Sequence, residues 1–196
     1  SPRARSSPTQ PRRSRQVGRS QHVHPNARGS CRVDWIATMS GYFAIGIMHG
    51  KTPQNIGTLW RSAEIFGAAF VFTVGARYKM QASDTAKTYR KVPLFNFATL
   101  ADLEAHLPFD CLLVGVELDE HAEPVETFSH PPRGVYLLGA EDNGLSNDER
   151  VACHRLVQLP GTRSMNVAAA GTVAMYARHL AVRQNRLTFQ KASAAE

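Results

Sequence analysis

The sequence predicts an α/β protein in which a parallel β-sheet is flanked by helices. From residue 42 onward, short runs that are apolar on both faces alternate with helical stretches. Strands of this kind are typical of a parallel sheet that is covered on both sides. With 196 residues, of which 43% are hydrophobic, the chain can bury one substantial core. We therefore expect a single α/β domain.

The first elements follow from apolar spacing. The run at residues 43–48 predicts a buried strand. In residues 55–66 the apolar positions Leu59, Ala63 and Phe66 recur at helical spacing, so this segment is predicted to be a helix with those side chains facing inward. A second apolar run and a polar stretch follow, at residues 69–74 and 75–91.

The later elements complete the alternating pattern. Further apolar runs predict strands at residues 92–97, 111–116, 134–138 and 155–159. A short helix is expected at residues 99–107, and Ser146 is a suitable N-cap for another. A long helix is expected at residues 164–184. Strands and helices thus alternate to the end of the domain.

The net charge of +7 belongs to the first 38 residues, which carry eight arginines against one aspartate. Residues 39–196 hold 15 basic and 15 acidic side chains. We predict that residues 1–38, an Arg/Ser/Pro-rich tail without apolar periodicity, are disordered. The tail could grip RNA, target an organelle, or lie outside the native protein; we favour the last, because Met39 directly precedes the first strand and would make a natural start.

Cysteine usage and hydropathy limit the class of protein. Cys31, Cys111 and Cys153 are widely spaced and form no Cys-x-x-Cys pair, which favours a reduced compartment without a disulfide framework or a zinc site. The scattered histidines do not form a metal-ligand pattern either. No apolar run approaches the roughly 20 residues that cross a bilayer. We expect a soluble, cytoplasmic protein that binds neither membrane nor metal.

Three stretches place polar side chains among glycines and apolar residues. They are NIGTLWRSAEIFG at residues 55–67, LLGAEDNGLS at residues 137–146 and LPGTRSMNVAAAGTVAMYAR at residues 159–178. Each lies at or beside the end of a predicted strand, where parallel α/β sheets bind ligands. Neither a Gly-x-Gly-x-x-Gly fingerprint nor a Walker loop is present in the sequence, which disfavours dinucleotides and nucleoside triphosphates. The pattern predicts a small-molecule site beside an arginine and a carboxylate.

These stretches resemble the three sequence motifs of the SpoU/TrmH class of the SPOUT superfamily, the S-adenosylmethionine-dependent RNA ribose 2′-O-methyltransferases. Order and spacing agree over residues 43–183. The matching residues are Asn55, Gly57, Arg61, Ala63, Leu138, Gly139, Glu141, Gly144, Leu145, Leu159, Pro160, Ser164, Asn166 and Val167. The resemblance implies a SPOUT-type fold with a deep C-terminal trefoil knot, S-adenosylmethionine as cofactor, and a homodimer that shares residues across its interface.

The resemblance also implies individual roles. The catalytic set would be Arg61, Asn55, Glu141, Ser164 and Asn166. The cofactor would be bound by Val116, Leu138, Gly139, Gly144, Leu159, Ser164, Met165 and Asn166. Since a guanidinium stays protonated, gripping an RNA phosphate and orienting the ribose is the safer role for Arg61. Whether the phosphate or Arg61 accepts the proton stays open. The segment between Pro160 and Ser164 is shorter than the class pattern, so the cofactor loop is expected to be tighter.

A basic loop is the candidate RNA surface. Together with Arg61, the predicted RNA-binding residues are Arg77, Lys79, Lys87, Arg90 and Lys91. Each candidate has a structural alternative: the basic loop and Arg61 could be solvated, Arg61 could pair with Glu64, and Glu141 could favour a turn. Asn55, Ser164 and Asn166 could act only as helix caps.

The sequence therefore predicts a cytoplasmic, homodimeric RNA 2′-O-methyltransferase. Transfer RNA is favoured over ribosomal RNA because the domain is minimal and shows no separate RNA-recognition domain. The alternative is a noncatalytic RNA-binding or assembly module that retains the fold, which a cofactor-binding titration would distinguish. A nucleotide-dependent oxidoreductase is much less favoured, because the phosphate-binding fingerprint is missing.

Overall fold

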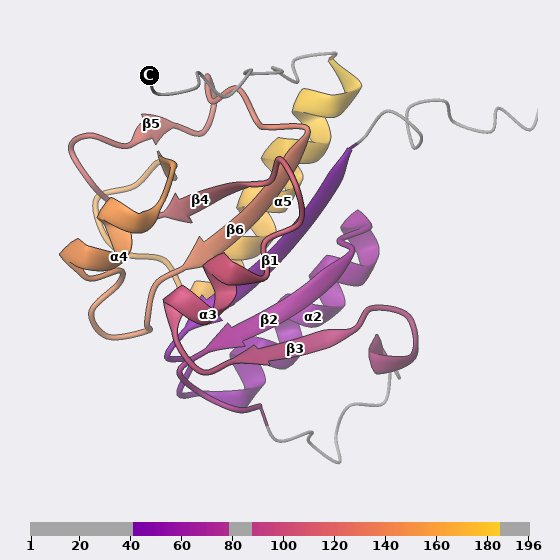
Figure 1. Ribbon diagram of the computed structural model, residues 1–196. Helices are drawn as coiled ribbons and strands as arrows, with labels where there is room; N and C mark the ends of the chain where they lie inside the picture. Colours follow the sequence, from indigo (N-terminus) through magenta and orange to yellow (C-terminus); the bar gives the residue numbers. More distant parts are fainter. Residues whose placement is uncertain (1–40, 79–87, 185–196) are drawn as a thin grey trace, which may run out of the picture. The chain divides into compact units, whose positions relative to one another are not determined.

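The computed structural model describes residues 41–78 and 88–184 (Figure 1). Their centre is a seven-stranded sheet in the order β3-β2-β1-β6-β4-β7-β5. Every pairing in it is parallel. The strands are β1 (Tyr42–Met48), β2 (Phe70–Val74), β3 (Leu94–Phe97), β4 (Leu112–Val116), β5 (Glu123–Pro124), β6 (Arg133–Leu138) and β7 (Arg155–Gln158). The predicted parallel α/β sheet is confirmed.

Helices cover both faces of this sheet. Two long helices, α2 (Pro53–Phe66) and α5 (Val167–Arg183), pack against each other on one face (Figure 1). The short helices α3 (Leu100–Ala105) and α4 (Asn147–Ala152) lie on the other, and a single 3₁₀ turn (Thr88–Arg90) precedes β3. The sheet is therefore flanked by helices, as predicted.

Two helix starts and one short strand differ most from the sequence prediction. α2 starts two residues early, with Thr52 as N-cap and Pro53 in the first turn, where a missing N–H costs nothing. α5 starts at Val167 rather than at residue 164, because Asn166 is its N-cap. β5 was not predicted, since two residues carry no periodicity. A tertiary contact holds β5 in place: Arg155 of β7 donates to the Glu123 carboxylate from Nε at 2.9 Å and from Nη2 at 2.7 Å.

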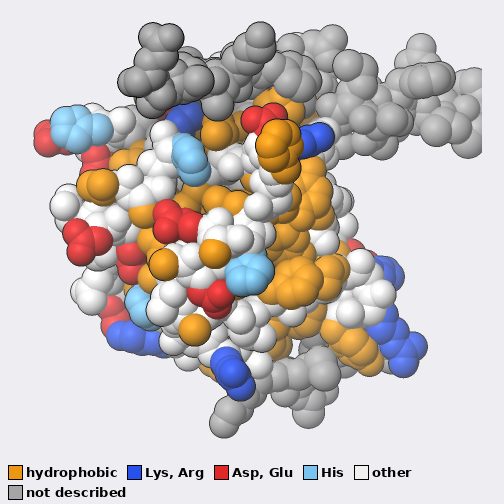
Figure 2. Space-filling view, in the orientation of Figure 1, with side chains coloured by type: hydrophobic (Ala, Val, Ile, Leu, Met, Phe, Trp, Pro, Cys, Tyr) orange, Lys and Arg blue, Asp and Glu red, His pale blue; other side chains and the backbone are white. Residues whose placement is uncertain are grey.

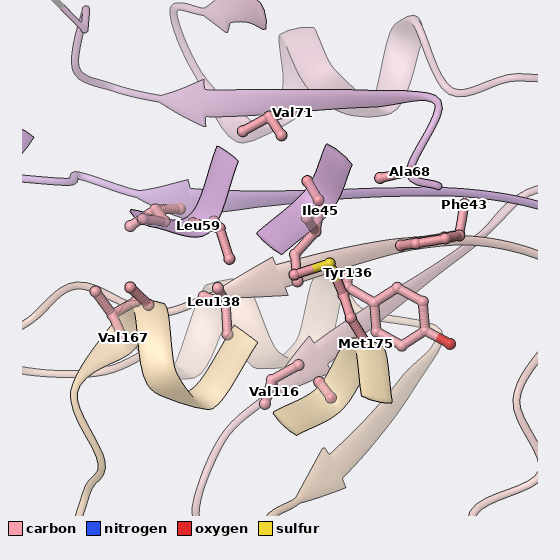
Figure 3. Close-up of a cluster of buried hydrophobic side chains, with 14 of the residues drawn as sticks. Phe43, Ile45, Leu59, Ala68, Val71, Val116, Tyr136, Leu138, Val167 and Met175 are labelled. Carbon is pink, nitrogen blue, oxygen red and sulfur yellow. The ribbon is translucent and has the colours of Figure 1, made fainter. Parts of the chain in front are cut away.

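Alternate residues of each strand feed two hydrophobic clusters. Phe43, Ile45 and Ile47 of β1 face the layer of α2 and α5, and Figure 3 shows Phe43 and Ile45 among the side chains of this cluster. The neighbouring Ala44 and Met48 belong to the cluster on the opposite face. This period-2 alternation explains why the strands read as continuously apolar.

Close contact between α5 and the rest of the domain depends on Gly171. A Cβ at this position would lie 2.4 Å from Leu59 Cδ1 of α2 and 2.9 Å from Leu138 Cδ1 of β6. Backbone contact of this kind fixes the height of α5 over the sheet. The N-terminus of α5 is thereby positioned at the carboxyl ends of the strands, where the predicted site lies.

The face opposite α2 and α5 carries an aromatic group on β2 and β3. Phe70 and Phe95 pack edge to face with their ring centroids 5.3 Å apart, and Phe95 stays exposed. Figure 2 shows hydrophobic side chains at the surface of this face, over β1 and β2. None of the helices in residues 41–78 and 88–184 combines the length and hydropathy that a membrane-spanning segment needs.

Candidate functional site

The three glycine-containing stretches meet at the carboxyl edge of the sheet. The first begins in the first turn of α2, the helix that follows β1, the second begins at the end of β6, and the third begins just after β7. In the sheet β6 lies beside β1, and β4 alone separates β6 from β7. Because these strands are parallel, the loops that follow them emerge at the same edge. Segments more than 100 residues apart, such as Asn55 and Asn166, can therefore meet there.

A hydrogen-bonded chain joins all three stretches. The Glu141 carboxylate accepts from the Thr52 backbone N–H at 3.0 Å and from the Thr52 hydroxyl. It also interacts with the side chain of Asn55 through a hydrogen bond. Asn55 Oδ1 in turn accepts from Asn166 Nδ2 at 3.1 Å. The structure thus brings three of the predicted catalytic residues, Asn55, Glu141 and Asn166, into one network.

Opposing effects act on the ionisation of Glu141. Partial burial raises the pKa of this carboxyl, but hydrogen bonds from Thr52 and Asn55 lower it by more, so its pKa lies below the ordinary value. Neighbouring Asp142 is bound to Lys51, which raises the pKa of that lysine. Glu141 is therefore ionised at neutral pH and serves as an acceptor of hydrogen bonds.

Helix caps and site residues coincide in part. Asn166 Oδ1 accepts from the backbone N–H groups of Ala168 at 3.0 Å and Ala169 at 3.2 Å, so Asn166 both caps α5 and reaches Asn55. The structure does not use Asn55 or Ser164 as an N-cap: Asn55 lies within the first turn of α2, and Ser164 lies in the loop before Asn166. The capping alternative therefore holds for Asn166 alone, alongside its contact across the site.

A cavity of about 270 Å³ opens beside this network. Its volume is close to the lower end of small-molecule sites, which start at roughly 300 Å³. All the predicted cofactor residues except Asn166 line the cavity: Val116, Leu138, Gly139, Gly144, Leu159, Ser164 and Met165. Figure 3 shows Val116 and Leu138 near Val167, which lines the cavity as well. The site thus has apolar walls and loops that offer backbone groups.

Some residues at the site were not predicted. Thr52 could have been found from its position just before Pro53, because Ser or Thr followed by Pro is a helix-start signal. Glu117 and Arg163 also line the cavity. Glu117 directly follows the predicted strand at 111–116, which is the only sequence signal for it. The hydrogen-bond partner of Glu117 could not be identified from sequence.

Arg61 lies apart from the network. It is exposed on α2, does not line the cavity, and forms no salt bridge within the described part of the chain. The alternative of an Arg61–Glu64 pair is not what the structure shows, since Glu64 bonds with Lys91. Arg61 lies six positions after Asn55, so the two side chains do not share a face of the helix. Within one chain, then, the structure does not bring Arg61 to the other catalytic candidates.

The basic loop is described only in part. Arg77 and Arg90 are exposed, and the Arg90 guanidinium lies 5.8 Å from the centroid of the Tyr89 ring. Lys91 is bound to Glu64. Lys79 and Lys87 lie outside the described residues, as does the predicted tail at residues 1–38. The described residues contain no cluster of three or more metal-binding side chains.

Sequence comparison identifies the domain. The model of the SpoU rRNA Methylase family matches residues 43–176. The 23S rRNA (guanosine-2′-O-)-methyltransferase RlmB of Acinetobacter baylyi is 30% identical over 135 residues, which cover 63% of this chain and 54% of RlmB. The chain therefore spans about half the length of that curated relative.

Solved structures share the fold. AviRb from Streptomyces viridochromogenes, a SpoU methyltransferase in complex with the cofactor AdoMet, is 26% identical with a TM-score of 0.59, covering 74% of this chain and 58% of AviRb. A TrmH/SpoU tRNA modifying enzyme of A. aeolicus has a TM-score of 0.66 at 13% identity, over 78% of this chain and 85% of its own, which shows the fold alone. With the family match extending over most of the described residues and the motif loops gathered at one edge of the sheet, the chain belongs to the SpoU rRNA methylase family.

Proposed function

We propose that this chain transfers a methyl group from S-adenosylmethionine to a ribose 2′-hydroxyl of RNA. The observation that carries the proposal is the chain of hydrogen bonds from Glu141 through Asn55 to Asn166 beside a cavity. Membership of the SpoU family supports the methyl transfer. The 2′-oxygen as acceptor is supported by RlmB, whose name specifies guanosine 2′-O-methylation of 23S rRNA.

The residues that line the cavity support S-adenosylmethionine as its ligand. Val116, Leu138 and Leu159 offer an apolar surface for an adenine ring. A guanidinium, Arg163, also lines the cavity and suits the carboxylate of the methionine end. AviRb, which shares this fold, has been solved with the same cofactor.

The chemistry needs alignment and proton removal. When bound, the cofactor supplies a methyl group that is already electrophilic because it is attached to a sulfonium. The residues of the chain must hold the ribose hydroxyl in line with that methyl group and accept or relay its proton. Ser164 and the Asn55–Asn166 pair offer hydrogen bonds to the ribose, while ionised Glu141 holds Asn55 and the start of α2 in place.

Arg61 would act across a homodimer interface. In one chain it is exposed and lies away from the cavity, as expected for a side chain that completes the site of a second copy. Apolar residues on the same helix layer support such an interface: Ile65 of α2 is 73% exposed and Tyr176 of α5 is 52% exposed. In this arrangement Arg61 grips an RNA phosphate with its planar fork and orients the ribose.

The knot expected from the family has support in the sheet order. β7 is inserted between β4 and β5, although β5 precedes it in sequence. The connection from β4 through β5 to β6 therefore lies on both sides of β7. We propose that the chain from β7 to α5 is threaded through that connection as a trefoil knot.

Ribosomal RNA is the substrate class to test first. The predicted preference for transfer RNA finds no support in the comparisons, since RlmB is named for 23S rRNA, while two structures whose names refer to tRNA are 18% and 13% identical and show the fold alone. The match covers only 54% of RlmB, so ribosomal RNA as the substrate of this chain is a proposal.

The test is incubation with methyl-labelled S-adenosylmethionine and separate rRNA and tRNA fractions from a methylation-deficient host. Modified riboses are then mapped by mass spectrometry. A 2′-O-methylated nucleotide in either fraction supports the proposal. If RNA binds but neither cofactor binding nor methyl transfer is detected, the noncatalytic RNA-binding module is the better assignment.

A further inference from the structure

Glu117 makes contacts that tie two loops of the cavity together. It directly follows β4 and lines the cavity. Its Oε1 accepts from the Leu118 backbone N–H at 3.0 Å, and its Oε2 accepts from the Leu145 backbone N–H at 2.6 Å. Leu145 belongs to the loop after β6, 28 positions along the chain. One carboxylate therefore satisfies backbone donors in both loops.

The loop after β6 is shaped to receive this carboxylate. Ala140 and Gly144 exchange two backbone hydrogen bonds of 3.0 Å, which close the tight turn that contains Glu141. Gly144 has a φ of 65°, and a Cβ on it would lie 2.4 Å from Glu117 Oε2. Glycine is thus needed twice at this position, for the backbone conformation and for the approach of Glu117.

The same turn is held from two sides. Glu141 fastens it to Thr52 at the start of α2, and Glu117 fastens it to the end of β4. Both oxygens of Glu117 are bonded to backbone N–H groups, and hydrogen bonds of this charge-assisted kind are stronger than neutral ones. Since Gly139 and Gly144 of one loop and Val116 and Glu117 at the end of β4 all line the cavity, the contact sets the spacing between these two segments.

We infer that Glu117 is a positioning residue that sets the affinity of the cavity for S-adenosylmethionine by clamping the turn at residues 140–144 to the end of β4. The inference rests on the proposed function and deepens it. Glu117 acts through the backbone of Gly144 and Leu145. Its loss widens or loosens the cofactor site without removing any group of the RNA-binding or methyl-accepting side.

The test measures cofactor binding and turnover separately on the full chain. Isothermal titration with S-adenosylmethionine should show a dissociation constant for Glu117→Ala that is raised roughly tenfold or more, since two hydrogen bonds to a charged group are lost. Glu117→Gln keeps the shape and one acceptor, so its dissociation constant should lie between those of Glu117→Ala and the unmodified chain. Glu120→Ala is the matched control, because Glu120 is a highly exposed carboxylate of the same segment and should bind as the unmodified chain does.

Kinetics separate positioning from general damage. In Glu117→Ala, KM for the cofactor should rise while kcat at saturating cofactor and KM for RNA stay unchanged. Gly144→Ala should also weaken cofactor binding because its methyl group displaces Glu117. In the double variant, cofactor affinity should fall by less than the product of the two single effects, because the alanine methyl group at position 144 no longer meets the Glu117 carboxylate.

Two results would overturn the inference. One is unchanged cofactor affinity in Glu117→Ala. The other is a fall in kcat at saturating cofactor that accompanies a loss of thermal stability of the ligand-free protein, which would indicate a structural role only. If instead the unmodified chain fails to bind S-adenosylmethionine, the proposed function fails first. Cofactor titration of the unmodified chain therefore distinguishes the two failures.

Discussion

The two ends of the sheet use polar side chains in opposite ways. At the amino ends of the strands, Arg178 of α5 is 2% exposed and donates to the carbonyl oxygens of Pro131 at 2.7 Å and Pro132 at 3.1 Å. Its guanidinium also lies 5.1 Å from the ring centroid of Phe43. At the carboxyl ends, Glu141 and Asn55 are half-buried and Asn166 is exposed, and Glu141 lines a cavity.

Burial separates structure from function along one helix. Both ends of α5 take part: Asn166 caps its start at the cavity, and Arg178 is buried near its end. Hydrogen bonds from a buried charge to backbone carbonyls are costly to lose, so they stabilise a single arrangement of the chain. Polar groups at the edge of a cavity keep room for further partners. We therefore expect changes at the amino end to alter stability and changes at the carboxyl end to alter methyl transfer.

The largest effect is expected for Arg61→Ala, which should abolish methyl transfer. A loss of roughly a hundredfold or more follows from removing a group that positions the substrate. Cofactor affinity should stay unchanged, because Arg61 does not line the cavity. Turnover assays and cofactor titration check both parts. Arg61→Lys, which keeps the charge but not the planar fork, should recover only part of the activity. Normal turnover of Arg61→Ala would count decisively against the proposed role.

Arg178→Met should lower the free energy of unfolding by about 2 to 4 kcal/mol, because two hydrogen bonds from a buried charged group are lost. The Pro131 oxygen loses the Arg178 donor, and the Pro132 oxygen keeps only the Tyr42 backbone N–H. Methyl transfer per folded molecule should be retained, since Arg178 lies at the other end of α5 from the cap. Urea unfolding measures the first quantity and turnover well below the melting temperature measures the second. Arg183→Met is the control, because Arg183 is exposed on the same helix. Equal stability in the two variants would remove the contrast between the two ends.

Asn166 is expected to affect both stability and methyl transfer, and two substitutions can separate these effects. Asn166→Ala should cost about 1 kcal/mol of stability through loss of the α5 cap, and should also reduce methyl transfer. Asn166→Asp keeps the capping oxygen but cannot donate to Asn55 Oδ1. The stability of Asn166→Asp should therefore be close to that of the unmodified chain, while its methyl transfer stays as low as that of Asn166→Ala. Thermal unfolding and turnover of both variants provide the comparison, and full activity of Asn166→Asp would show that the contact with Asn55 is dispensable.

The smallest effect concerns pH. The pKa of Glu141 is lowered in the folded protein, so its contacts contribute stability above the ordinary glutamate pKa of 4.5 and lose that contribution as pH falls through the lowered value. Glu141→Gln should remove this part of the acid dependence, which exposure to solvent keeps modest. Melting temperatures of both proteins from neutral to acidic pH test it. Parallel curves would mean that Glu141 does not contribute.

Local pattern was sufficient for the elements that bury long apolar runs. The strands near residues 43–48, 69–74 and 134–138 and the helix around residues 55–66 lie where the sequence predicted them, because burial on both faces leaves a continuous apolar signal. Helix ends were less well predicted: α5 begins at Val167, since its cap could be Ser164 or Asn166 on sequence grounds alone.

The sequence by itself determined the class of fold, the three motif stretches and about half of the residues that line the cavity, because each is written in a short segment. Only the tertiary structure decided which of these residues meet: Asn166 with Asn55, Glu117 with Leu145, and Arg155 with the two-residue strand β5. It also showed that Arg61 stands apart from its predicted partners. Such pairings join positions dozens of residues apart, and the geometry of the sheet, rather than any local periodicity, brings them together.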